Sequence, residues 1–169
     1  MIHVESELGE GTRFLVFLPE TSQTRASSPS LTLNKDMTGT ETILLVEDDE
    51  AVRALLVRQL EELGYRVLDA ANGEAALALD DQVDGHIDVL LSDIVMPGMR
   101  GPELARALKA RHPQLAVLLM SGYADLRVAA GELPDVAVEY LQKPIGRGVL
   151  AGALRQALVG SESLSEGSS

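Results

Sequence analysis

The stretch LLSDIVMPGMRGPEL, residues 90–104, decides the fold. It opens with an apolar run, passes through Asp93 into a Met-Pro-Gly turn, and ends where apolar residues begin to recur at helical spacing near Glu103. A strand followed by a turn and a helix is the repeating unit of α/β proteins. Asp93 therefore lies at the carboxyl end of a predicted strand.

More units of the same kind flank this stretch, each with a short apolar run followed by helical spacing. The predicted strands are residues 43–46, 66–68, 89–91, 116–120 and 138–141, and the helices after them are residues 51–63, 73–79, 103–110, a weak helix from residue 124, and residues 149–158. Strands that are apolar on both faces predict a parallel sheet covered by helices on both sides. We expect an α/β three-layer sandwich over residues 41–160, flavodoxin-like, with strand order 2-1-3-4-5.

The composition of the chain agrees with a folded domain and restricts its partners. Of 169 residues, 46% are hydrophobic and 24% are charged, which is the usual globular mixture. The formal net charge of -12 disfavours direct binding to nucleic acid or anionic lipid. There is no cysteine, and no apolar run reaches the ~18 residues of a membrane span. We therefore expect a cytoplasmic segment without nucleic-acid or membrane contacts.

The chain outside residues 41–160 falls into three pieces. Residues 1–20 contain two short apolar runs around a glycine-containing loop, which predicts a β-hairpin, and an isolated hairpin is only marginally stable in water. Residues 21–40 are rich in Ser and Thr without an apolar period, which is typical of a flexible linker. Residues 161–169 have the same character and are expected to form a disordered tail.

Polar side chains follow several of the predicted strands, at the edge where functional groups collect in doubly wound sheets. They are Glu47 and Asp48 after the first strand, Asp93 after the third, Ser121 after the fourth and Lys143 after the fifth. Carboxylates gathered in one concavity repel each other, and Mg²⁺, which prefers oxygen ligands, relieves that repulsion. An aspartate that attacks a phosphoryl group also needs the charge on the phosphoryl oxygens neutralised. A metal, a lysine and a hydroxyl together meet that need.

Each of these residues also has a simpler interpretation. Asp49 or Glu50 is expected to cap the helix that begins near residue 50. Ser121, before a glycine, can satisfy local backbone groups, and Asp93 alone would be an ordinary aspartate before a turn. Lys143 alone would be a surface lysine. Solvated or helix-capping roles are expected for the scattered histidines His3, His86 and His112.

Four motifs resemble the receiver domain of two-component response regulators. They are VEDDEAVR (46–53), LLSDIVMPGMRGPEL (90–104), LLMSGYA (118–124) and YLQKP (140–144). The resemblance implies that Asp93 is the phosphorylation site and that Glu47 and Asp48 form the acidic pair for Mg²⁺. It also implies that Asp93 is itself a metal ligand and that Val95 lends a backbone carbonyl to the metal.

The same resemblance assigns roles near the later strands. It implies that Lys143 pairs with the aspartate or its phosphate and that Ser121 is the switch hydroxyl. Tyr140 would be the aromatic side chain whose rotamer follows phosphorylation, although a tyrosine at a strand end also packs well without switching. The bond between Lys143 and Pro144 is expected to be cis.

Two positions depart from the family pattern. Arg100 stands where many relatives have an acidic residue, which removes a cap acceptor from the next helix. Ile145 replaces the common aromatic residue after Lys-Pro. Neither change touches the residues assigned to phosphoryl chemistry.

The first residues carry a second resemblance. IHVESELGEGTRFLVFLP, residues 2–19, is similar to the last two strands of the ATP-binding domain of sensor histidine kinases. The boxes that would hold ATP and Mg²⁺ in that family are missing, so this piece is not expected to bind ATP in the family's way. Together the two resemblances imply the C-terminal part of a hybrid sensor histidine kinase, whose parent chain is expected to be a histidine kinase.

The implied function is that of a phosphorelay receiver. A phosphohistidine on the kinase core, or on a separate histidine phosphotransfer protein, would donate to Asp93 with Mg²⁺ and switch a protein-interaction surface. The chain itself is expected to catalyse at most its own phosphorylation and dephosphorylation. One alternative is a pseudo-receiver, an interaction module that works without phosphorylation. A phosphatase is disfavoured, because its nucleophile would follow the first strand in a DxD arrangement.

Overall fold

The computed structural model describes two units, which consist of residues 2–7, 11–16, 39–83, 86–122 and 138–163. The first unit is a hairpin of β1 (Ile2–Glu7) and β2 (Gly11–Val16), which pair antiparallel. Gly11 begins β2 with a φ of 102°, a conformation that glycine adopts without strain. The predicted N-terminal hairpin is confirmed, with a first strand longer than the apolar run had indicated.

The second unit contains a five-stranded parallel sheet. Its strands are β3 (Thr42–Val46), β4 (Arg66–Ala70), β5 (Val89–Asp93), β6 (Ala116–Ser121) and β7 (Glu139–Gln142). They lie in the order β4-β3-β5-β6-β7, and every neighbouring pair is parallel. Counted from β3 as the first strand, this is the predicted flavodoxin-like order 2-1-3-4-5.

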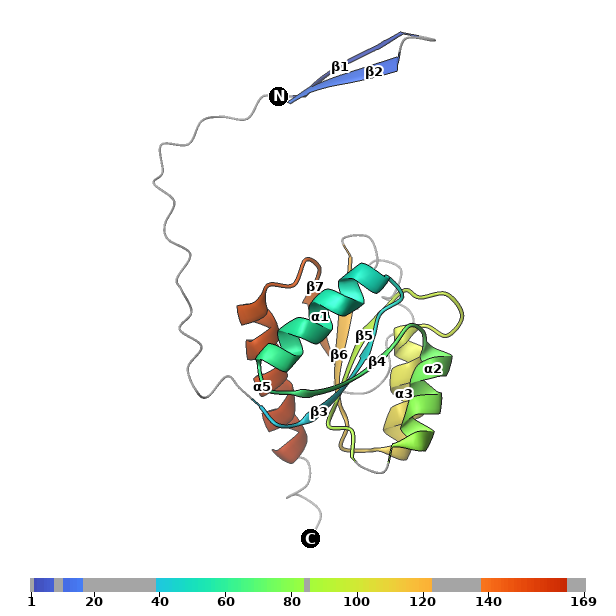
Figure 1. Ribbon diagram of the computed structural model, residues 1–169, viewed down its shortest axis with the longest axis vertical. Coiled ribbons are helices and arrows are strands. Elements are labelled where there is room, and N and C mark those ends of the chain that lie inside the picture. The colour runs from blue at the N-terminus through green and yellow to red at the C-terminus, as the bar shows by residue number, and fades with distance from the viewer. Residues whose placement is uncertain (1, 8–10, 17–38, 84–85, 123–137, 164–169) are drawn as a thin grey trace. The chain divides into compact units, whose positions relative to one another are not determined.

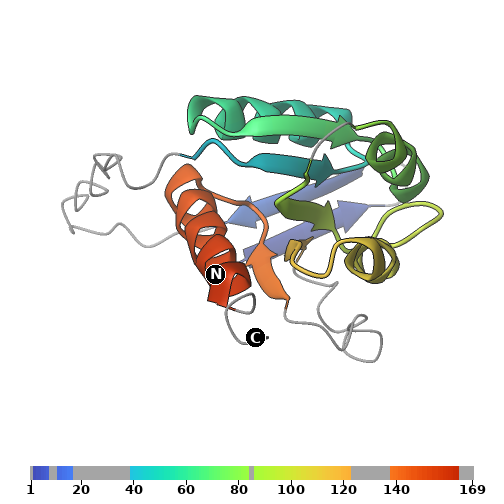
Figure 2. The ribbon, with the colours of Figure 1, turned by 90° about the horizontal axis from the view of Figure 1, so that it is seen from below.

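Helices cover both faces of this sheet (Figure 1, and from below in Figure 2). The described ones are α1 (Glu50–Glu62), α2 (Gly73–Gln82), α3 (Gly101–Arg111) and α5 (Arg147–Ser163). Two of them, α1 and α5, pack on one face, and α2 and α3 pack on the other. This is the predicted three-layer sandwich. None of the described helices combines the length and apolarity needed to cross a bilayer.

The alternation of side chains along β3 explains why its residues 43–46 are all apolar. Ile43 and Leu45 pack in the core under α1 and α5, whereas Leu44 and Val46 pack in the core under α2 and α3. All four side chains are fully buried. Because successive strand residues point to opposite faces, a strand between two helical layers needs an apolar residue at every position.

Two helix starts test the capping expectations. The carboxylate of Asp49 accepts hydrogen bonds from the backbone N–H groups of Ala51 at 2.9 Å and Val52 at 3.0 Å, so Asp49 caps α1 as expected. At the start of α3, the guanidinium of Arg100 offers no acceptor. The carboxylate of Glu103 instead accepts from the backbone N–H of Arg100 at 3.0 Å.

Several predictions fall outside the described residues. The weak helix from residue 124 does so, as do most of the linker predicted at residues 21–40 and residues 164–169 of the predicted tail. The helix α5 runs to Ser163 and so includes the first residues of that tail.

Candidate functional site

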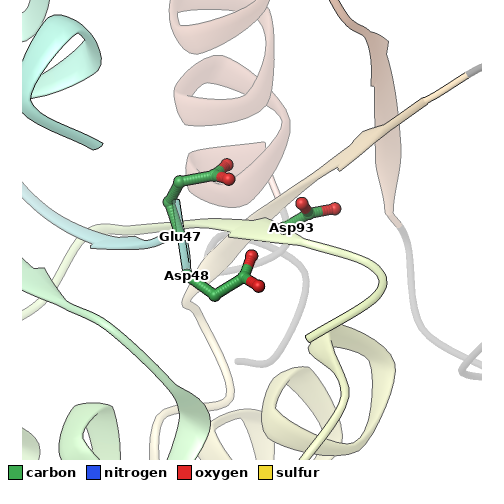
Figure 3. Close-up of side chains that lie close together, drawn as sticks. All are labelled: Glu47, Asp48 and Asp93. Atoms are coloured by element: carbon green, nitrogen blue, oxygen red, sulfur yellow. The ribbon is translucent and has the colours of Figure 1, made fainter. Parts of the chain in front are cut away.

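The carboxyl ends of β3 and β5 bring three acidic side chains together (Figure 3). The register pairs Val46 with Ser92, so Glu47, directly after β3, and Asp93, the last residue of β5, follow at the same edge. One carboxylate oxygen from each of Glu47, Asp48 and Asp93 lies within 4.8 Å of the others. Glu47 is 1% exposed and Asp93 is 8% exposed, whereas Asp48 faces solvent. The structure thus assembles the acidic group that the strand order predicts.

Lys143 reaches this acidic group from the residues after β7. Its ammonium Nζ donates to Oδ2 of Asp93 at 2.6 Å and to Oε2 of Glu47 at 2.7 Å. The backbone N–H of Lys143 donates to the carbonyl of Ser121 at 2.8 Å, which ties this residue to the end of β6. The bond between Lys143 and Pro144 is cis, as predicted.

The electrostatics of the site depend on one lysine ammonium, that of Lys143, lying close to several carboxyl groups. Burial raises the pKa of the Glu47 carboxyl, and the charges of Asp93 and Asp48 act in the same direction against the opposing effect of Lys143. Burial alone would lower the pKa of Lys143, but hydrogen bonds to Asp93 and Glu47 outweigh it and raise that pKa. The lysine therefore stays charged at neutral pH.

Ser121 supplies a buried hydroxyl at the end of β6, the strand beside β5. Met120 pairs with Asp93 across β5 and β6, and Ser121 follows it on β6. Ser121 is fully buried, and its Oγ has no hydrogen-bond partner among the residues that the structure describes. A buried hydroxyl without a partner is costly, so the Ser121 Oγ needs a hydrogen-bond partner beyond the described residues.

Tyr140 lies on β7 opposite Leu119 of β6. The tyrosine is 36% exposed, whereas the next residue, Leu141, is buried in the core under α1 and α5. Tyr140 therefore faces away from those two helices. Its predicted change of rotamer on phosphorylation stays a prediction.

The segment between β5 and α3 carries Val95, the residue expected to offer a backbone carbonyl. The N–H of Val95 lies 3.4 Å from Oδ1 of Asp93. Further along, Gly98 adopts a φ of 76°, and the carboxylate of Glu74 accepts from the N–H of Met99 at 3.2 Å. The start of α2 thus helps to hold this segment beside the acidic group. The metal role of the Val95 carbonyl stays a prediction.

Gly101 is a site residue that the sequence pattern did not single out. A Cβ at this position would collide with the backbone carbonyl of Asp93 and would lie 3.1 Å from the Ser92 hydroxyl. The N–H of Gly101 donates to the carbonyl of Ile94 at 3.2 Å. The first turn of α3 therefore lies directly against Asp93. A glycine in that turn, where it has no helix-forming advantage, was the available signal.

The donor set fits a hard divalent cation. Three carboxylates converge, and the cation that bonds to two of them within the described part of the chain is Lys143. The exposure of Asp48 opens the site to water, and Mg²⁺ usually keeps several waters beside one or two carboxylates. Mg²⁺ is therefore compatible with the residues present, and its binding here is a proposal developed below.

The described histidines have carboxylate neighbours that sequence spacing did not indicate. His112 is the C-cap residue of α3, and its Nε2 lies 2.8 Å from Oδ1 of Asp80 on α2. Nε2 of His86 lies 3.8 Å from Oδ1 of Asp88. Neither histidine belongs to the acidic site. The side chain of His3 lies outside the described residues.

Comparison with known proteins agrees with this architecture. Residues 43–155 match the family model of the response regulator receiver domain. The chain is 36% identical over 165 residues to the sensor kinase CckA of Brucella abortus, covering 93% of this chain and 18% of that kinase. It is 39% identical over 102 residues to the DNA-binding transcriptional regulator NtrC of Salmonella typhimurium, covering 60% of this chain and 21% of that regulator. The crystal structure of the receiver domain from the hybrid histidine kinase CckA has 36% identity and a TM-score of 0.58, covering 69% of this chain and 98% of that one.

The fold and the acidic edge of its sheet define a receiver-type α/β domain. The chain belongs to the response regulator receiver domain family and is a receiver domain of two-component signalling. It spans 18% and 21% of the lengths of the two curated relatives named above.

Proposed function

We propose that Asp93 is the phosphoacceptor of this receiver and takes its phosphoryl group from a phosphohistidine. The observation that carries the proposal is the position of Asp93, which is nearly buried, bonded to Lys143 at 2.6 Å and grouped with Glu47 and Asp48. Asp93 also ends β5, the central strand of the sheet, at the edge where doubly wound folds bind ligands.

In the proposed transfer, a carboxylate oxygen of Asp93 forms a bond to phosphorus while the P–N bond of phosphohistidine breaks. The electron pair of that bond leaves with the imidazole, which takes up a proton, and Asp93 becomes an acyl phosphate. The three carboxylates, and the Val95 carbonyl as the resemblance implies, would hold Mg²⁺, which would supply positive charge to the phosphoryl oxygens. Lys143 provides a second cation at Asp93. Attack by water on the acyl phosphate returns the carboxylate and inorganic phosphate.

Two residues on the neighbouring strands support a switching role. The Ser121 hydroxyl is a donor without a described partner, and a phosphoryl oxygen on Asp93 supplies the acceptor that it lacks. Tyr140, on the adjacent strand β7, is partly exposed and can respond if Ser121 moves. Phosphorylation then biases a two-state equilibrium of the surface formed by β6, β7 and α5.

An apolar groove beside the site supports a helical donor partner. The groove has a volume of about 380 Å³. Its lining residues are Val52, Leu55 and Leu56 of α1 with Lys143, Pro144 and Ile145 after β7. Leu55 is 56% exposed, and Lys143 belongs both to the groove and to the acidic site. A helix that carries phosphohistidine, from a kinase core or a phosphotransfer protein, is the occupant that brings a phosphoryl group to Asp93 from this side.

We also propose that the chain derives from a hybrid sensor histidine kinase, with residues 1–20 as the end of its ATP-binding domain. The described hairpin supports this origin. The similarity to CckA covers 93% of this chain, more than the 43–155 receiver match, and so extends beyond the receiver. The upstream reading frame tests this origin, which requires a complete kinase core there.

Incubation with phosphoramidate and Mg²⁺ tests the acceptor proposal, because this small donor carries the P–N bond of phosphohistidine. We expect one added phosphoryl group in the parent chain and none in Asp93→Asn. Asp81→Asn, which makes the same change in charge on α2, is expected to be phosphorylated normally. Phosphorylation of Asp93→Asn, or none of the parent, would refute the proposal.

A further inference from the structure

Arg53 on α1 contacts the backbone of the acidic pair. Its Nη1 donates to the carbonyl oxygen of Glu47 at 2.8 Å, and its Nε lies 3.3 Å from Oδ2 of Asp69 on β4. The arginine side chain is only 18% exposed. One guanidinium therefore connects α1, the end of β3 and β4.

The contact with Arg53 is one of two hydrogen bonds that hold the backbone of Glu47 in place. The N–H of Glu47 donates to the carbonyl of Ala70 on β4 at 3.1 Å, so β4 holds one side of the residue and Arg53 holds the other. Residues 47–49 belong to neither a helix nor a strand. External contacts of this kind therefore set the direction in which the Glu47 and Asp48 carboxylates leave the backbone.

Arg53 and Lys143 act on different atoms of Glu47. Lys143 bonds the carboxylate, the group that a metal ion requires. Arg53 bonds the carbonyl of the same residue and leaves the carboxylate free to bind a metal. A divalent cation competes with Lys143 for Glu47 but not with Arg53.

We propose that Arg53 is a positioning residue for divalent-cation binding, and that Asp69 in turn positions Arg53. By holding the Glu47 carbonyl, Arg53 keeps both acidic side chains directed towards Asp93. Ligand partners of this kind commonly affect metal affinity although they never contact the metal. The inference rests on the proposed function, since it assumes that the three carboxylates bind Mg²⁺.

The geometry requires an arginine. Two nitrogens of one planar guanidinium contact two acceptors at once, whereas the single nitrogen of a lysine cannot reproduce that fork. Arg53→Lys is therefore expected to keep part of the contribution of Arg53 to divalent-cation affinity, and Arg53→Met none of it.

Calorimetric titration of the full chain with Mg²⁺, without a phosphodonor, is the test. We expect Arg53→Met to raise the Kd for Mg²⁺ about tenfold, with Arg53→Lys between it and the parent. A pure charge effect has the opposite sign, because loss of a cation near three carboxylates favours a divalent cation. At saturating Mg²⁺, the phosphorylation rate of Arg53→Met should recover towards that of the parent.

Arg58→Met is the matched control. Arg58 lies on the same helix, is 79% exposed and pairs with Glu62 at 3.0 Å. We expect its Kd for Mg²⁺ to equal that of the parent. An unchanged or lower Kd in Arg53→Met, or an equal rise in Arg58→Met, would overturn the inference.

Two further outcomes are also decisive. If Arg53→Met does not fold, Arg53→Lys decides, and a parental Kd in that variant overturns the inference. If the parent itself binds no Mg²⁺, both the inference and the proposed cofactor fail. If the parent binds Mg²⁺ and Arg53→Met binds it with the same Kd, the inference about Arg53 fails but the proposed cofactor stands.

Discussion

Replacing Asp48 with asparagine is expected to stabilise the metal-free chain. Oxygens of Asp48, Glu47 and Asp93 lie within 4.8 Å of one another, and Lys143 bonds only the last two. Two unit charges at 4.8 Å repel by about 0.9 kcal/mol in a dielectric of about 80, which suits the exposed Asp48. Asp48 takes part in two such pairs, and the attraction to Lys143 offsets part of this repulsion. We therefore expect the free energy of unfolding to rise by about 1 kcal/mol.

Urea unfolding in chelator and in Mg²⁺ measures this effect. In chelator, Asp48→Asn should unfold at higher urea than the parent. In Mg²⁺ at ten times its Kd, the parent should gain about 1.4 kcal/mol, because the metal binds the folded chain. Asp48→Asn should gain much less, since it has lost a ligand.

Glu61→Gln is the control for net charge. It removes one negative charge from the last turns of α1, where the residue is exposed. We expect little change in stability and an undiminished response to Mg²⁺. Lower stability of Asp48→Asn in chelator, or a Mg²⁺ gain equal to that of the parent, would refute the reasoning about shared charge.

Three other changes have distinct expected outcomes. Ser121→Ala should change the free energy of unfolding by less than about 1 kcal/mol, because the buried hydroxyl has no described partner, yet should slow phosphorylation by phosphoramidate. Gly101→Ala should destabilise the chain by about 1–3 kcal/mol, measured in urea, because its Cβ meets the Asp93 carbonyl. Arg155→Met should cost about 1–2 kcal/mol at pH 7, because Arg155 bonds Glu41 at 2.8 Å. Burial tends to raise the pKa of Glu41, but hydrogen bonds, chiefly from Arg155, lower it below 4.5. That stability is present above pH 4.5 and is lost as the pH falls through the lowered pKa, so the parent and Arg155→Met should converge in acid.

The layered fold was predictable because its central strands contain continuous apolar runs, such as residues 43–46, 89–91 and 116–120. Residues 43–46 pack against helices on both faces of the sheet, so all four are apolar. A strand with one face in solvent would instead alternate apolar and polar residues. The predicted strand order then placed Glu47, Asp93 and Lys143 at one edge, as the structure has them. Side-chain roles at this edge followed from the resemblance to receiver domains.

Contacts made by long side chains on helices were not predictable. The bond from Arg53 to the Glu47 carbonyl depends on a rotamer, and the bond between His112 and Asp80 joins residues 32 apart through the packing of two helices. Apolar periodicity shows which face of a helix is buried, but it does not determine which groups the polar side chains on the other faces bond. The contact between Gly101 and Asp93 likewise depends on the angle at which α3 begins.

Intact-mass measurement after incubation with acetyl phosphate tests the central claim most directly. With Mg²⁺, the parent chain should gain the mass of one phosphoryl group, and peptide mapping after reductive trapping of the acyl phosphate should place it on Asp93. With chelator, or in Asp93→Asn, the gain should disappear. A phosphoryl group on another residue, or no gain in the presence of Mg²⁺, would contradict the assignment of Asp93 as the acceptor.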